Sequence, residues 1–191
     1  MATKKLTGAD YLLLLLYLNN KQPILGAVRL TKMMFIFEKE IVPILKSKGN
    51  VIEKLPEFIP YNFGPFSRDV YEQIELFQGI KFINILNINA NEDMSEVDDY
   101  EESLYINEMH NDGYSLNTDG KYYKYTLLTT GEKYVCSEIL PWVSEEHQAL
   151  LSTFKEKITS LSPKQILRYV YTKYPDYAEK SLIKDEVLKN E

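Results

Sequence analysis

The chain has 191 residues, of which 45% are hydrophobic and 13% aromatic, and this composition excludes an intrinsically disordered protein. Its formal net charge is −6, but ten of the acidic residues fall between positions 90 and 120, a stretch with no lysine or arginine. The rest of the chain carries 22 basic and 18 acidic residues, so the overall charge does not exclude nucleic-acid binding.

The first predicted helix follows Thr7. Thr7 and Asp10 have the spacing of a reciprocal N-terminal capping box. Residues 12–18 are apolar on nearly every side of the helix, so we expect this helix to be central. The apolar run is too short to cross a bilayer and no cleavage site follows it, and the single cysteine indicates a reducing compartment. We therefore expect a cytoplasmic protein without a membrane partner.

A second helix is predicted to start near Val28, where apolar residues recur at helical spacing until Pro43 kinks or ends it. Arg29 and Lys32 fall on the side that this spacing assigns to solvent. Residues 51–64 contain two prolines and predict an irregular or edge-strand connection.

The third helix is predicted from Pro65 to about Gln78, because proline presets φ for a first helical position. Residues 80–88 and 122–128 are rich in β-branched and aromatic residues and predict the two strands of a hairpin. The acidic stretch lies between them, and a run of like charges is typical of a solvated loop.

Three further helices are predicted to follow, the first from Thr129 and the others capped by Ser144 and Ser162. The order of elements predicts an α+β, mostly α fold, with a winged-helix-like N-terminal unit that carries a long β-hairpin, followed by a C-terminal helical segment. We place the winged-helix-like unit at residues 1–143, with the acidic hairpin insertion at about 90–120, and the C-terminal helices packed on it at 144–191.

Reactive side chains are sparse. Cys136 and His147 are separated by a proline, and no third group is evident to orient the histidine. Two histidines and one cysteine cannot form an ordinary zinc site, and no glycine-rich phosphate loop is present. We expect no catalytic residues, metal or cofactor. A metal- or carboxylate-dependent enzyme remains the second alternative, since a sequence does not give the distances between carboxylates.

The winged-helix order makes a DNA-binding transcription regulator the first alternative. In that geometry the third helix would enter the major groove, but its outer face combines one arginine with three acids, which is poor for phosphate contacts. The candidate nucleic-acid contacts are Arg29, Lys32, Arg68, Lys121 and Lys124.

Two segments resemble a known family. Residues 23–35 (PILGAVRLTKMMF) and 60–67 (PYNFGPFS) resemble the YwgA-like prokaryotic protein family and, more distantly, the Panacea (SocA-like) antitoxin domain. Residues 125–131 and 169–175 are similar to later stretches of the YwgA-like pattern. The resemblance implies a compact, mostly helical protein from a mobile-element or defence context, and Panacea relatives bind toxins or act as adaptors.

Fifteen tyrosines, several of them clustered, favour contacts with another protein, because tyrosine is enriched at interfaces. Together with the missing catalytic set, this favours a non-catalytic regulatory module that binds another protein. The family resemblance implies that the module is antitoxin-like or adaptor-like, with a toxin or regulatory protein encoded nearby as its partner. The expected partner-binding residues are Tyr61, Phe63, Gly64, Pro65, Phe66, Ser67, Arg68 and Gln73. The alternative for this turn is that its aromatic residues anchor it in the core.

Overall fold

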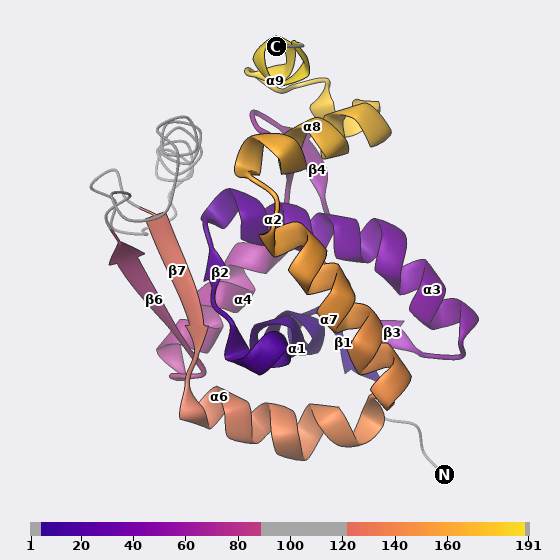
Figure 1. Cartoon of the computed structure of the whole chain (residues 1–191), viewed down its shortest axis with the longest axis vertical. Coiled ribbons are helices and arrows are strands. Elements are labelled where there is room, and N and C mark those ends of the chain that lie inside the picture. Colours follow the sequence, from indigo (N-terminus) through magenta and orange to yellow (C-terminus); the bar gives the residue numbers. More distant parts are fainter. Residues whose placement is uncertain (1–4, 89–121, 190–191) are drawn as a thin grey trace.

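Helix α1 (Gly8–Lys21) lies at the centre of the fold, and the other elements surround it (Figure 1). The computed structural model describes residues 5–88 and 122–189, so the acidic stretch at about 90–120 and Lys121 lie outside the described residues. The predicted capping box is confirmed, since the Asp10 carboxylate accepts the Thr7 amide at 2.8 Å and the Thr7 hydroxyl accepts the Asp10 amide. The leucines at positions 12–16 are at most 2% exposed, as the all-round apolar pattern predicts.

The second helical stretch is continuous but changes pitch. It consists of α2 (Ala27–Ile36), the π-helical turn η1 (Phe37–Ile41) and α3 (Val42–Ser47). Pro43 lies in the first turn of α3, where its missing N–H costs little. Every residue of α2 is buried, so the prediction that Arg29 and Lys32 face solvent is wrong. The reason is tertiary, because α2 packs against α7, α8 and strand β5 as well as its own neighbours.

The connection at 51–64 contains short strands. The strand β1 (Leu6–Thr7) pairs in parallel with β3 (Ile52–Glu53), and β4 (Ile59–Tyr61) forms a hairpin with β5 (Gly64–Phe66). The prediction that the third helix starts at Pro65 is wrong, since Pro65 belongs to β5. Helix α4 (Arg68–Gly79) starts after Ser67, whose side chain accepts the Val70 amide.

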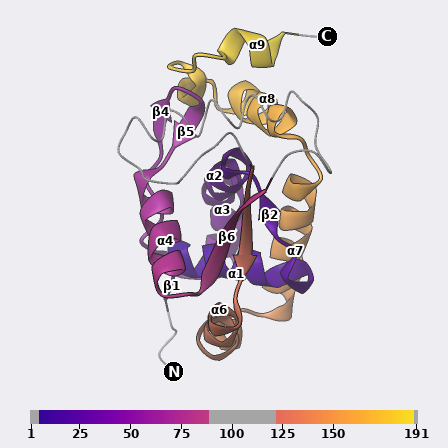
Figure 2. The ribbon, with the colours of Figure 1, turned by 90° about the vertical axis from the view of Figure 1, so that its left-hand side faces the viewer.

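The predicted hairpin is confirmed as β6 (Ile83–Ile88) and β7 (Tyr122–Leu127), which pair antiparallel. Strand β2 (Ile24–Leu25) pairs with the other edge of β7 and completes a sheet of order β2-β7-β6. Figure 2 shows β6 and β7 side by side, with α4 and α7 on opposite sides of the molecule. The fold is thus mostly α with small sheets, as expected for its class.

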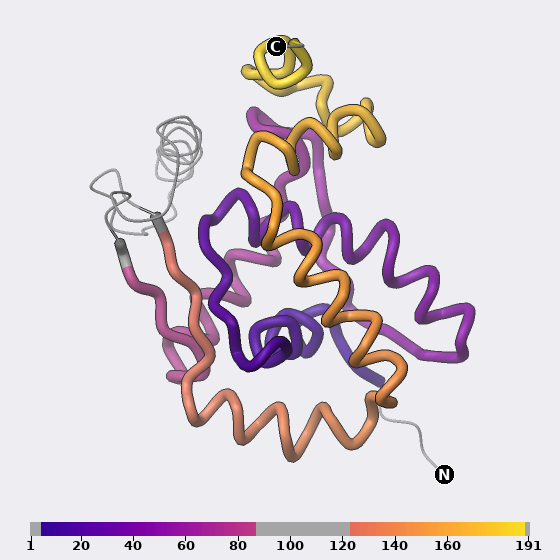
Figure 3. The backbone as a smooth tube through the Cα atoms, viewed as in Figure 1, coloured from indigo at the N-terminus to yellow at the C-terminus, as the bar shows by residue number. Residues whose placement is uncertain are grey.

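The C-terminal half is helical. Its elements are α6 (Thr129–Tyr134), η3 (Val135–Ile139), η4 (Leu140–Trp142), α7 (Glu145–Thr159), α8 (Pro163–Lys173), η5 (Pro175–Ala178) and α9 (Lys184–Leu188). The predicted caps Ser144 and Ser162 are both confirmed. The tube in Figure 3 traces α7 across α1 and then α8 toward the end of the chain.

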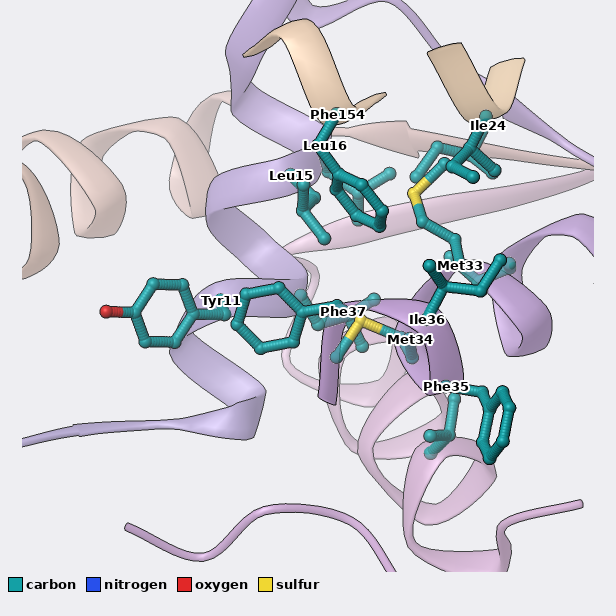
Figure 4. Packing of buried hydrophobic residues seen from close by; sticks show 14 of the residues in the cluster. Tyr11, Leu15, Leu16, Ile24, Met33, Met34, Phe35, Ile36, Phe37 and Phe154 are labelled. Atoms are coloured by element: carbon teal, nitrogen blue, oxygen red, sulfur yellow. The ribbon is translucent and has the colours of Figure 1, made fainter. Parts of the chain in front are cut away.

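One hydrophobic cluster connects both halves of the chain. Phe154 of α7 lies beside Leu15 and Leu16 of α1, with Met34 of α2 below them and the side chain of Met33 directed toward Ile24 (Figure 4). Phe35 contacts the rings of Phe58, Tyr174 and Tyr177 at centroid distances of 4.7–5.3 Å. In residues 5–88 and 122–189, no helix combines the length and apolarity needed to cross a membrane.

Candidate functional site

The outer face of α4 is exposed and partly apolar. Val70, Ile74 and Phe77 point into the core, which leaves the opposite face of the helix to solvent. On that face, Leu76 is 52% exposed and Ile80, at the C-cap, is 47% exposed. Residues four apart in a helix are neighbours, so these two side chains form one apolar patch on consecutive turns.

The N-terminal half of this face is charged. Arg68 Nε donates a hydrogen bond to the Glu72 carboxylate at 3.0 Å, and both side chains are more than half exposed. Asp69 accepts the backbone amide of Glu57 at 2.8 Å, which ties the preceding loop to the first turn of α4. With Glu75, the face carries three carboxylates against one guanidinium.

A cleft of about 440 Å³ opens beside this charged half. Its walls are the first turn of α1, the loop residues 54–56, and Asp69, Glu72 and Gln73 of α4. The backbone of Lys54 has a φ of +48°, a conformation that residues other than glycine seldom adopt. We define the α4 surface as this cleft together with the partly exposed Gln73 and the exposed residues Arg68, Asp69, Glu72, Glu75, Leu76 and Ile80.

Most of the expected partner-binding residues lie inside the fold. Phe63 and Phe66 are 5% and 8% exposed, Ser67 is 1% exposed, and Gly64 and Pro65 are buried as well. These five residues therefore do not offer their side chains to a partner. Among the expected residues, Arg68 is exposed, and Tyr61 and Gln73 are partly exposed.

The Gly-Pro step has a structural role instead. Gly64 has a φ of +81°, and a Cβ at this position would lie 2.5 Å from Cε1 of Tyr171. Glycine is thus needed both for the backbone conformation and for the close approach of α8. Phe66 stacks on Tyr71 at a centroid distance of 5.5 Å, so the turn is anchored in the core, which was the alternative for this segment.

Two of the candidate nucleic-acid contacts are buried and serve the backbone. Arg29 is 6% exposed and donates to the carbonyls of Leu25 and Leu161. Lys32 is fully buried and donates to the carbonyl of Pro65 at 2.9 Å. Their burial counts against the predicted phosphate contacts, because each cation would have to leave these carbonyls to reach a ligand at the surface.

The remaining candidates for phosphate contacts are spread out. Arg68 is exposed on α4, and Lys124 is partly exposed on β7. Lys121 lies outside the described residues.

The chemically reactive side chains have separate neighbours. Cys136 is exposed, and its thiol lies 3.8 Å from the Tyr17 hydroxyl. Nε2 of His147 lies 3.3 Å from the side-chain amide of Asn50. No group of three or more histidine, cysteine, aspartate or glutamate side chains that could hold a metal ion occurs in the described ranges.

No protein-family model matches this chain, and no curated protein matches it either. The function must therefore be argued from the geometry.

The tyrosine clusters offer less surface than their number suggested, since Tyr123, Tyr125 and Tyr171 are at most 3% exposed. The partly buried Tyr169, Tyr174 and Tyr177 pack against the core.

A buried cation on α7 went unnoticed in the sequence. Lys155 is fully buried, and its ammonium donates to the carbonyls of Leu18 and Gln22 at 2.8 and 2.7 Å. These carbonyls lie where α1 is distorted, because Leu18 is non-helical and Asn19, Asn20 and Lys21 have positive φ. The sequence does indicate this burial, because Lys155 lies at helical spacing from Leu151 and Ile158 and therefore shares their buried face of α7.

Proposed function

We propose that this protein is a non-catalytic regulatory module of the cytoplasm, antitoxin-like or adaptor-like, that binds another protein through the α4 surface. The observation that carries the proposal is the pair of half-exposed apolar side chains, Leu76 and Ile80, on the helix whose charged N-terminal half lines a cleft of about 440 Å³. Apolar groups at the centre of a patch, with polar groups around them, are the usual anatomy of a protein interface.

The energetics support a protein as the partner. Burying a leucine or isoleucine side chain contributes roughly 1.5–3 kcal/mol when the side chain goes from full exposure to full burial. Leu76 and Ile80 are already about half buried, so each would contribute about half of that free energy when a partner covers it. The three carboxylates beside them favour a partner surface with lysine or arginine around an apolar centre.

The resemblance to YwgA-like and Panacea proteins supports the same class of function. It suggests that the partner is a toxin or regulatory protein encoded near this chain. Such a partner would be tested by co-purification of the chain with each neighbouring gene product, followed by size-exclusion chromatography with light scattering.

The decisive variants change the α4 surface without touching the core. The double variant Leu76→Glu/Ile80→Glu should weaken the complex at least 10-fold, because it places two charges where apolar contact is needed. The matched control is Leu182→Glu, since Leu182 is 69% exposed and belongs to the segment before α9. Equal affinity of the double variant and the control would refute the α4 surface as the binding site.

A winged-helix transcription regulator is the second candidate, and the topology supports it. The chain order of α1, α2, α4, β6 and β7 agrees with the order of three helices and two strands from which we inferred a winged helix. Strand β2, which pairs with β7, adds a third strand to this hairpin. The acidic face of α4 and the burial of Arg29 and Lys32 count against phosphate binding.

Fluorescence anisotropy with duplex DNA at 50 mM salt tests this candidate. DNA binding that strengthens at low salt and is reduced by Arg68→Ala or Lys124→Ala would favour it over the protein-binding proposal. An anisotropy that does not change with DNA concentration would remove it.

A further inference from the structure

A second cavity, of about 190 Å³, lies between the π-helical turn η1, helix α7 and helix α8. Most of its wall is apolar, with Ile41, Leu150, Phe154, Ile158 and Leu161 contributing. Small-molecule sites commonly combine such an apolar wall with a few placed polar groups. Here the polar groups include Glu40 and Tyr169 on one side and Lys157 on α7.

The Glu40 carboxylate is held in place by three donors on one oxygen. Oε1 accepts the hydroxyl of Tyr169 at 2.7 Å and that of Tyr174 at 3.0 Å, and the Lys173 ammonium lies 3.0 Å away. Partial burial raises the pKa of this carboxyl, but the hydrogen bonds from Tyr169, Lys173 and Tyr174 outweigh it, so the net pKa is lowered. Glu40 is therefore ionised at neutral pH.

The second oxygen of Glu40 remains available to a ligand. Among residues 5–88 and 122–189, no hydrogen bond reaches Oε2. Glu40 belongs to the π-helical turn, and such turns are found frequently at functional sites. Two side chains of α8 and the Tyr174 hydroxyl at its C-cap thus hold a charged acceptor of η1 at the wall of an apolar cavity.

Charge and size define the ligand. Lys173 neutralises Glu40, and Lys157 adds a further positive charge, so a second cation is disfavoured next to the carboxylate. A neutral hydroxyl is the donor that suits Oε2. An apolar cavity of about 150 Å³ lined by Leu, Ile and Phe can hold benzene, so about 190 Å³ accommodates one aromatic ring with a short substituent.

We propose that this cavity binds a small, neutral phenol or aromatic alcohol, whose ring contacts Phe154 and Ile158 and whose hydroxyl donates to Oε2 of Glu40. The site is separate from the α4 surface, and the proposal does not depend on the proposed function.

The test is a titration of the full chain with 4-methylphenol. Binding is measured by isothermal titration calorimetry and by two-dimensional NMR. We expect saturable binding, with toluene bound about 10-fold more weakly, because it fills the same space without donating to Glu40. Glu40→Gln should weaken 4-methylphenol binding by about 10- to 100-fold, since the acceptor loses its charge. Glu186→Gln, an exposed carboxylate on α9, is the matched control and should leave the affinity unchanged.

A second variant separates loss of the site from loss of the fold. Thr153 is exposed and lines the cavity, so Thr153→Trp should fill the entrance and abolish binding while the circular dichroism spectrum stays native. Unchanged affinity of Thr153→Trp would overturn the proposal, as would no binding of 4-methylphenol to the wild type at millimolar concentration. Tighter binding of benzylamine than of 4-methylphenol would overturn the assignment of a neutral ligand.

Discussion

The buried lysine of α7 should make the stability of this protein depend on pH. Lys155 is fully buried, and burial lowers the pKa of its ammonium from 10.5 to about 8. The unfolded chain holds this proton more tightly than the folded chain does. Between pH 8 and 10.5 the unfolded state therefore binds more protons, and the free energy of unfolding rises with pH.

The size of the effect follows from the two pKa values. Well below pH 8 both states carry the charge, and the full penalty of burying it is present. As the pH rises through 8, the folded chain loses the proton first and the penalty is relieved. Linkage with these two pKa values gives a gain of about 2 kcal/mol in the free energy of unfolding between pH 7 and pH 9.5.

Lys155→Met removes the titrating group and keeps a side chain of similar length. The measurement is urea unfolding, followed by circular dichroism, of the wild type and the variant at several pH values from 7 to 9.5. The tyrosines titrate in both proteins, so their contribution cancels in the difference. The wild type should gain about 2 kcal/mol relative to Lys155→Met over this range.

Lys133→Met is the control, because Lys133 is exposed on α6. Its stability relative to the wild type should change little over the same pH range. If the difference between the wild type and Lys155→Met also stays constant within about 0.5 kcal/mol, burial does not lower the pKa of Lys155 and the reasoning fails.

Three other predictions concern stability and use the same urea assay. Gly64→Ala should lower the free energy of unfolding by about 2–4 kcal/mol, because the new alanine would have a positive φ and its Cβ would also clash with Tyr171. Gly49 has a similar φ of +84° but open space around it, so Gly49→Ala should cost only about 1 kcal/mol. Equal losses would show that the close approach at Gly64 is unimportant. Phe66→Ala should cost about 3–5 kcal/mol as a core truncation, and a loss below about 1 kcal/mol would contradict its burial. Ser162→Ala removes a capping box and should cost about 1 kcal/mol, and an unchanged midpoint would argue against the cap.

Local chemistry made the starts of several helices predictable. A capping box depends on residues three apart, so Thr7 with Asp10, and the caps Ser144 and Ser162, could be recognised without the fold. The β6–β7 hairpin was predictable for a similar reason, because its strands are rich in β-branched and aromatic residues.

Local chemistry was misleading where several elements cover one segment. Helical periodicity assigned Arg29 and Lys32 to solvent, but α2 is covered on all sides and both cations are bonded to carbonyls. Pro65 has the preference of a first helical residue, yet the pairing of β4 with β5 places it in a strand. In both cases contacts between residues far apart in sequence overrode a weak local preference.

The sequence by itself determined the class of fold, the caps and the hairpin, because these follow from short-range spacing and side-chain shape. Only the tertiary structure decided which charges are buried and where the cavities lie. The cleft beside α4 joins residues 7–9, 54–56 and 69–73, and the smaller cavity joins η1 to α7 and α8. Such sites arise where separate segments meet, and the position of that meeting depends on the packing of the whole core.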